Sequence, residues 1–140
     1  MKILSITTSS KICGVAILED TNIIKEINLD NGLTHSEALM PLIKQIFEET
    51  NLTLSDMDLL ISDIGPGSFT GIRIGIATIK AFADSLNIPS IGVSSLDSLT
   101  YNSQNMGVIC SLIDAKKNNV YCEIFDCLLY TLTLPTILLV

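Results

Sequence analysis

The stretch Gly65-Pro66-Gly67-Ser68-Phe69-Thr70-Gly71 joins a predicted buried strand at residues 58–64 to a predicted helix at residues 70–86. Glycine permits positive φ and proline holds φ near about −65°, so the stretch predicts a tight turn. The amides at the start of the following helix also make a candidate anion cradle. The glycine spacing fits neither a Walker P-loop nor the G-x-G-x-x-G motif. The tight turn and the anion cradle therefore both stay open as interpretations of this stretch. The residues that would form a phosphate loop are Gly65, Gly67, Ser68, Thr70 and Gly71.

Three short apolar segments precede this turn, at residues 2–8, 12–18 and 23–29. Their connections are too short for a crossover helix, so we expect antiparallel neighbouring strands. Thr34 and Glu37 have the spacing of a capping box and predict the start of a helix. Apolar residues at helical spacing predict the core face of this helix: Leu39, Leu42, Ile43, Ile46 and Phe47.

The second half of the chain predicts a strand at residues 90–93, a helix that begins after Ser94 and a hairpin over residues 108–125. Strands, then alternating helices and strands, then strands again are typical of a mixed α/β fold. The uncharged segment from residue 127 to residue 140 is shorter than the roughly 20 residues that span a bilayer. We therefore expect a buried strand there, or an aggregation-prone stretch if the segment is left open, and no membrane association.

The predicted helix at residues 70–86 has two apolar faces, whereas a surface helix of a monomer needs one. The first face consists of Ile72, Ile76, Ile79 and Ala83. The second face consists of Ile74, Ala77 and Ala81. A charged border between the two faces consists of Arg73, Lys80 and Asp84. Glycines at positions 71 and 75 permit a close backbone approach. Burial within the fold and contact with a partner protein both explain a second face.

Composition excludes several classes of protein. The 140 residues carry a net charge of −7, with 48% hydrophobic and 16% charged residues, which is typical of a globular chain of about one domain. The acidic balance argues against unaided nucleic-acid binding. Four cysteines are too few for a secreted disulfide scaffold, so we expect buried thiols and a cytoplasmic location.

Candidate catalytic residues are scarce. The single histidine, His35, lies within the predicted capping box with no nucleophile nearby in the sequence. Zinc enzymes need several histidine, cysteine or carboxylate ligands in register. We therefore expect no catalytic residue, no metal and no cofactor.

Five blocks of sequence carry a resemblance to a known family. They are Met1-Lys2-Ile3-Leu4-Ser5-Ile6-x-Thr8-Ser9, His35-Ser36-Glu37-x-Leu39-x-Pro41, Gly65-Pro66-Gly67-Ser68-Phe69-Thr70-Gly71-Ile72-Arg73-Ile74-Gly75, Gly92-Val93-Ser94-Ser95-Leu96 and Ile113-Asp114-Ala115-Lys116. Together they closely resemble the TsaB (YeaZ) family of the bacterial tRNA threonylcarbamoyladenosine machinery, over residues 1–126. The resemblance implies an actin-like (ASKHA, ribonuclease H-like) α/β fold. Residues 1–104 would form its first lobe, and residues 105–140 part of its second.

The resemblance also implies a function. Family members are non-catalytic partners that dimerise with TsaD and help to recruit the ATPase TsaE. The complex transfers a threonylcarbamoyl group to an adenosine beside the tRNA anticodon, and tRNA would be reached only through the complex. In family members the surface that binds TsaD is formed largely by the two helices of the first lobe. A homodimer of this chain would use the same surface. The positions that would line it here are Met40, Lys44, Phe47, Arg73, Ile74, Ala77, Lys80 and Ala81.

Two departures from the family pattern matter. Thr7 stands where the family usually has an aspartate, which disfavours nucleotide or metal binding. The family also has a longer second lobe, so a fragment or a frame-shifted product is expected. Two other functions stay open: a glycoprotease-like metallopeptidase, and a nucleotide-binding sensor that uses residues 65–71.

Overall fold

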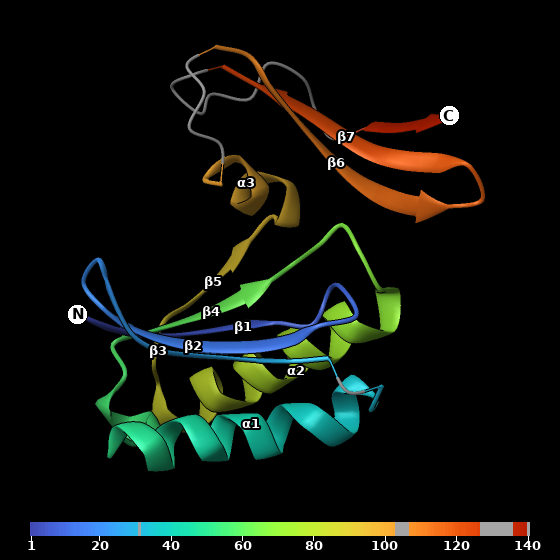
Figure 1. The fold of residues 1–140 in the computed structure, drawn as a ribbon. Helices are drawn as coiled ribbons and strands as arrows, with labels where there is room; N and C mark the ends of the chain where they lie inside the picture. Colours follow the sequence, from blue (N-terminus) through green and yellow to red (C-terminus); the bar gives the residue numbers. More distant parts are fainter. Residues whose placement is uncertain (31, 103–106, 127–135, 140) are drawn as a thin grey trace. The chain divides into compact units, whose positions relative to one another are not determined.

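The structure, a computed structural model, describes residues 1–30, 32–102, 107–126 and 136–139. The chain forms two compact units (Figure 1). The first contains Met1–Ile64 and Ser68–Gly92, and the second contains Gly65–Gly67 together with the described residues from Val93 onward. The lobe boundary after residue 104 stays a prediction.

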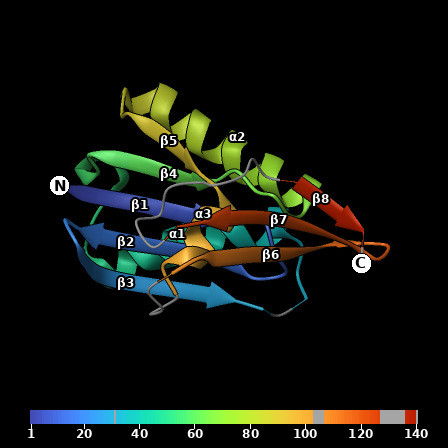
Figure 2. The ribbon, with the colours of Figure 1, turned by 90° about the horizontal axis from the view of Figure 1, so that it is seen from above.

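The first unit is built on a five-stranded sheet. Its strands are β1 (Lys2–Thr7), β2 (Cys13–Glu19), β3 (Asn22–Leu29), β4 (Leu59–Asp63) and β5 (Ser90–Val93). Their order across the sheet is β3-β2-β1-β4-β5 (Figure 2). The first three strands are antiparallel, as predicted, and β4 pairs parallel to β1. The carboxyl ends of β1 and β4 therefore lie side by side.

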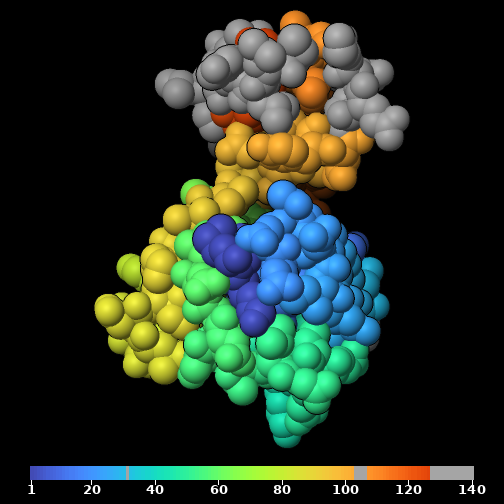
Figure 3. Space-filling view, turned by 90° about the vertical axis from the view of Figure 1, so that its left-hand side faces the viewer, coloured from blue at the N-terminus to red at the C-terminus, as the bar shows by residue number. Residues whose placement is uncertain are grey.

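Two helices, α1 (His35–Thr50) and α2 (Phe69–Leu86), cover one face of this sheet (Figure 1). A short 3₁₀ helix, η1 (Leu54–Asp56), leads from α1 to β4. Figure 3 shows the end of the sheet that holds the N-terminus, the turn between β2 and β3 and the connection from α1 to β4. The polar residues described below lie at the other end.

The predicted start of α1 is confirmed. Thr34 is the N-cap residue, and its backbone N–H donates to Glu37 Oε2 at 3.1 Å. The Thr34 hydroxyl donates to the same oxygen at 2.6 Å. Both hydrogen bonds lower the pKa of the Glu37 carboxyl from its ordinary value of 4.5.

The core of the first unit lies between the sheet and the two helices. Four of the five predicted core residues of α1 are buried, and Phe47 is half-buried against the same core. The buried cluster consists of Leu4, Ile6, Cys13, Val15, Ile17, Ala38, Leu39, Leu42, Ile43, Ile46, Met57, Leu60 and Ile79. Burial of such side chains contributes about 25 cal/mol per Å² of apolar surface removed from water.

Helix α2 turns its glycine edge, not its isoleucine face, towards the sheet. The buried residues of this helix are Gly71, Gly75 and Ile79. Of the first predicted apolar face, only Ile79 is buried, while Ile72, Ile76 and Ala83 are half-buried. A Cβ on Gly71 would lie 1.9 Å from the Thr8 carbonyl oxygen, so only glycine allows this approach. The close backbone approach predicted for the two glycines is confirmed at Gly71, while at Gly75 a Cβ would lie 2.5 Å from the Thr8 hydroxyl oxygen.

The second unit contains α3 (Ser95–Thr100) and a sheet of order β6-β7-β8. Its strands are β6 (Ile109–Lys116), β7 (Asn119–Phe125) and β8 (Thr136–Leu139). The predicted hairpin is confirmed as β6 and β7, and β8 pairs antiparallel to β7. The predicted strand in the uncharged tail is thus confirmed at residues 136–139. The structure does not describe the burial of this strand, and residues 127–135 lie outside the described residues. Ser94 caps α3 by accepting from two backbone amides.

The cysteines differ in exposure. Cys13 and Cys122 are buried, as predicted, but Cys110 is exposed, so the prediction of a buried thiol is wrong there. Cys110 lies on β6, an outer strand of its sheet, and Leu112 and Asp114 on the same face of that strand are exposed as well. Cys127 lies outside the described residues. No helix among the described residues is long and apolar enough to cross a bilayer.

Candidate functional site

Polar side chains gather where the parallel strands β1 and β4 end. The Thr7 hydroxyl donates to Asp63 Oδ2 at 2.8 Å, and the Ser9 hydroxyl donates to the same oxygen. These contacts follow from the register of the two strands, which pairs Ile6 with Ser62 and leaves Thr7 beside Asp63. The sequence pattern indicates Thr7 as a notable position but gives no sign of its partner, Asp63. One carboxylate thus holds two hydroxyls at this edge.

The first turn of α2 lies against the same edge. The Ser68 backbone N–H donates to the Ser9 carbonyl oxygen at 2.6 Å, and the Ser68 hydroxyl accepts from the Gly71 amide at 3.2 Å. The Thr8 hydroxyl donates to the Gly71 carbonyl oxygen at 2.7 Å, in a buried position. Two amides of the predicted phosphate loop, at Ser68 and Gly71, are therefore bound within the chain itself.

His35 packs beside this edge as a structural ring. Its Nε2 lies 2.8 Å from the Ser10 carbonyl oxygen, so Nε2 carries the proton and donates. The ring also limits the space around α2, since a Cβ on Gly71 would lie 2.9 Å from His35 Cδ2. The only histidine of the sequence thus joins α1 to the β1–β2 turn.

These contacts bear on the two interpretations of the glycine-rich turn. An anion cradle needs amides that point at the ligand, and a carboxylate beside it opposes a bound phosphate. Here two of the amides have partners in the chain and Asp63 lies at the same edge. The geometry favours a packing role for residues 68–71. The phosphate loop itself stays a prediction.

A second candidate site is the outer surface of α2, where charged and apolar side chains alternate. Arg73, Ala77, Lys80 and Ala81 are all exposed. The Arg73 guanidinium stacks 3.9 Å from the centre of the Phe69 ring, which is 68% exposed. Such an aromatic–arginine pair is typical of protein interfaces. Sequence reasoning missed Phe69, although its i, i+4 spacing from Arg73 was a signal.

The other predicted surface residues differ in exposure. On α1, Met40 is exposed, and Lys44 is exposed and forms an ion pair with Glu48 at 3.6 Å. Phe47 and Ile74 are half-buried and pack against the core. The helices α1 and α2 contact each other, so Met40, Lys44 and the exposed residues of α2 belong to one layer of the first unit. Within this layer, Ile74 supports the fold more than it forms an open surface.

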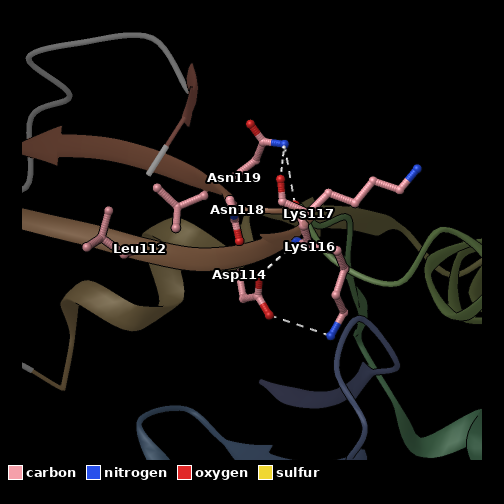
Figure 4. A pocket seen from close by; sticks show the side chains of 7 residues that line it. Leu112, Asp114, Lys116, Lys117, Asn118 and Asn119 are labelled. Atoms are coloured by element: carbon pink, nitrogen blue, oxygen red, sulfur yellow. Dashed lines mark hydrogen bonds and ion pairs between the residues drawn. The ribbon is translucent and has the colours of Figure 1, made fainter.

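A shallow hollow of about 450 Å³ lies at the β6–β7 turn of the second unit (Figure 4). Lys116 Nζ lies 3.6 Å from Asp114 Oδ2 and forms an ion pair with it. Asn119 Nδ2 donates to the Lys117 carbonyl oxygen at 3.1 Å. The backbone N–H of Lys116 bonds to the Asp114 carboxylate and holds the pKa of that group below its ordinary value. These contacts close the turn on itself. Among the described side chains, no group of three potential metal ligands is present.

The sequence matches a family model over residues 31–132, and its description is "TsaD: tRNA N6-adenosine threonylcarbamoyltransferase". The chain belongs to the TsaD family. The resemblance to its TsaB (YeaZ) relatives is also confirmed. The tRNA threonylcarbamoyladenosine biosynthesis protein TsaB of Bacillus subtilis is 34% identical over 127 residues, covering 90% of this chain and 56% of that protein. Its counterpart in Escherichia coli is 32% identical over 124 residues, covering 86% and 53%.

A solved structure of YeaZ from Pseudomonas aeruginosa superimposes with a TM-score of 0.87 at 26% identity. The match covers 98% of this chain and 67% of that one. The predicted actin-like, ribonuclease H-like α/β fold is confirmed. The chain spans about half the length of the curated TsaB relatives it matches.

Proposed function

We propose that this chain is a non-catalytic partner in tRNA N6-threonylcarbamoyladenosine biosynthesis, which dimerises with TsaD through α1 and α2 and helps to recruit TsaE. In this proposal TsaD carries out the threonylcarbamoyl transfer in the cytoplasm. The observation that carries the proposal is the similarity to proteins named for this biosynthesis, over most of the chain.

The exposed layer of α1 and α2 supports a protein partner. It offers an aromatic–arginine pair at Phe69 and Arg73, an exposed methionine at position 40 and small side chains at Ala77 and Ala81. Aromatic and arginine side chains contribute most to interface affinity, and small side chains let a second helix approach closely. We place the contact with TsaD on this surface, with Lys44 and Lys80 at its rim.

The structural role of His35 supports a non-catalytic role for this chain in the complex. A metallopeptidase or a His-based transferase would need its histidine aimed at a substrate, but Nε2 of this ring donates to the Ser10 carbonyl oxygen. The net charge of −7 supports a chain that reaches tRNA only through its partners. The nucleotide-sensor alternative is less favoured, because the Ser68 and Gly71 amides already have partners.

A reconstituted transfer assay tests this function. TsaD, TsaE, ATP, the threonylcarbamoyl donor and tRNA are incubated with this chain, without it, and with this chain in place of TsaD. We expect modified tRNA to increase when the chain joins TsaD, and no product when TsaD is left out. The matched variants are Lys80→Glu on the proposed surface and Lys117→Glu, the same charge change on the exposed β6–β7 turn. Product that forms without TsaD, or a Lys117→Glu loss as large as that of Lys80→Glu, would overturn the proposal.

A further inference from the structure

Two cysteines of the second unit lie within reach of each other across adjacent strands. Cys110 Sγ on β6 and Cys122 Sγ on β7 are 3.4 Å apart. In the β6–β7 register, Cys110 pairs with Ile124 and Cys122 pairs with Leu112, so the two cysteines are diagonal neighbours. Side chains two positions apart on a strand share a face, which places both thiols on the same side of the sheet.

The two thiols differ in access to solvent. Cys110 is exposed and lies on an outer strand, while Cys122 is 6% exposed and lies on the central strand of the sheet β6-β7-β8. The hydrogen bond with Cys110 raises the pKa of the Cys122 thiol, with burial as the next cause. An exposed thiol with a buried thiol 3.4 Å behind it has the access and the proximity that an attacking and a resolving cysteine need.

We propose that Cys110 and Cys122 are a reversible redox pair that reduces a hydroperoxide and closes a disulfide between β6 and β7. The Cys110 thiol loses its proton to water, its thiolate attacks the terminal peroxide oxygen, and the O–O bond breaks. The remaining oxygen leaves as alkoxide or hydroxide and takes up that proton to form alcohol or water. Cys110 becomes a sulfenic acid. Cys122 then attacks the Cys110 sulfur, the S–O bond breaks, and the hydroxide that leaves takes the Cys122 proton to form water. The two sulfurs together lose two electrons and the peroxide gains them.

The geometry requires a small movement. The sulfurs must approach from 3.4 Å to the about 2.05 Å of a disulfide bond. Diagonal neighbours have Cα atoms about 7–8 Å apart, at or beyond the usual span of a disulfide. Closing the bond therefore draws β6 towards β7, and a thiol reductant reopens it. The bond would tie the outer strand to the central one.

The test treats the purified 140-residue chain with hydrogen peroxide and measures its intact mass, its free thiols and its linked peptides. All proteins carry Cys127→Ser, since Cys127 is a competing thiol outside the described residues. We expect a mass decrease of about 2 Da, a peptide pair joined through Cys110 and Cys122, and recovery with dithiothreitol. Cys13→Ser is the matched control, because it removes a buried thiol of the first unit and should leave the reaction unchanged.

Two variants separate the roles. Cys110→Ser should slow thiol oxidation at least about tenfold, because the buried thiol reacts poorly. Cys122→Ala should stop at a sulfenic acid on Cys110, which dimedone traps. Circular dichroism confirms that each variant is folded. Loss of 2 Da in folded Cys110→Ser, only intermolecular disulfides in the wild type, or a sulfinic acid on Cys110 with no linked peptide would each overturn the proposal.

Discussion

Replacing Gly71 with alanine probes the close approach of α2 to the sheet. The new Cβ would lie 1.9 Å from the Thr8 carbonyl oxygen and 3.1 Å from its carbon. Ordinary contact begins at 3.4 Å, and backbone atoms cannot rotate away as a flexible side chain can. Helix α2 must therefore move outward by roughly 1.5 Å, about one heavy-atom radius.

This movement has a cost that can be approximated. Overpacking of a well-packed site costs about 1–3 kcal/mol. Loss of the buried hydrogen bond from the Thr8 hydroxyl to the Gly71 carbonyl oxygen costs about 1–3 kcal/mol more. The higher helix propensity of alanine returns roughly 1 kcal/mol. We expect a net destabilisation of about 3 kcal/mol, which lowers Tm by about 10 °C for a chain of this size.

Thermal unfolding followed by circular dichroism measures this change, with Ser85→Ala as the control. Ser85 lies on the exposed side of the same helix, and its replacement should shift Tm by no more than about 2 °C. A Gly71→Ala protein that melts within about 2 °C of the wild type would refute the reasoning, because the close approach of α2 would then not exist.

Three further predictions concern the first unit. Glu37→Gln should flatten the acid side of the curve of Tm against pH. The folded pKa of Glu37 lies below its ordinary value of 4.5, so the contribution of the carboxylate to stability is present above that value and is lost as the pH falls through the folded pKa. A variant curve parallel to that of the wild type would contradict this. Thr7→Val keeps the shape of the side chain but removes a donor to Asp63, so urea unfolding should show a loss of about 1 kcal/mol, and an unchanged midpoint would count against the hydrogen bond. Phe69→Ala should weaken binding to TsaD about thirtyfold by calorimetry while leaving Tm within about 2 °C, because the ring is mostly exposed; undiminished affinity would remove Phe69 from the interface.

Local patterns predicted the elements of this fold well, because short-range physics sets them. The antiparallel strands follow from their short connections, and the start of α1 follows from Thr34 and Glu37. The orientation of α2 could not be predicted in this way. Hydrophobic periodicity marks two apolar faces and does not decide between them, but the helix turns Gly71 and Gly75 inward because Thr8 leaves no room for a side chain at either position.

The candidate sites depended more on long-range contacts. The contact of Thr7 with Asp63 requires the parallel register of β1 and β4, which the sequence does not show. The proximity of Cys110 and Cys122 requires the register of the β6–β7 hairpin, which the sequence pattern does not give. The sequence predicts Phe69 in the turn before α2, whereas Phe69 is the first residue of the helix and stacks on Arg73.

The central claim, a partner of TsaD that binds through α1 and α2, is tested most directly by size-exclusion chromatography with light scattering. The chain is run alone and mixed with TsaD from the same organism. Ala77→Glu serves as the interface variant because Ala77 is exposed, whereas Ile74 packs on the core and its replacement would disturb the fold. The account predicts a heterodimer that Ala77→Glu abolishes and Lys117→Glu preserves. A folded chain that never binds TsaD, or a heterodimer that Ala77→Glu leaves intact, would contradict it.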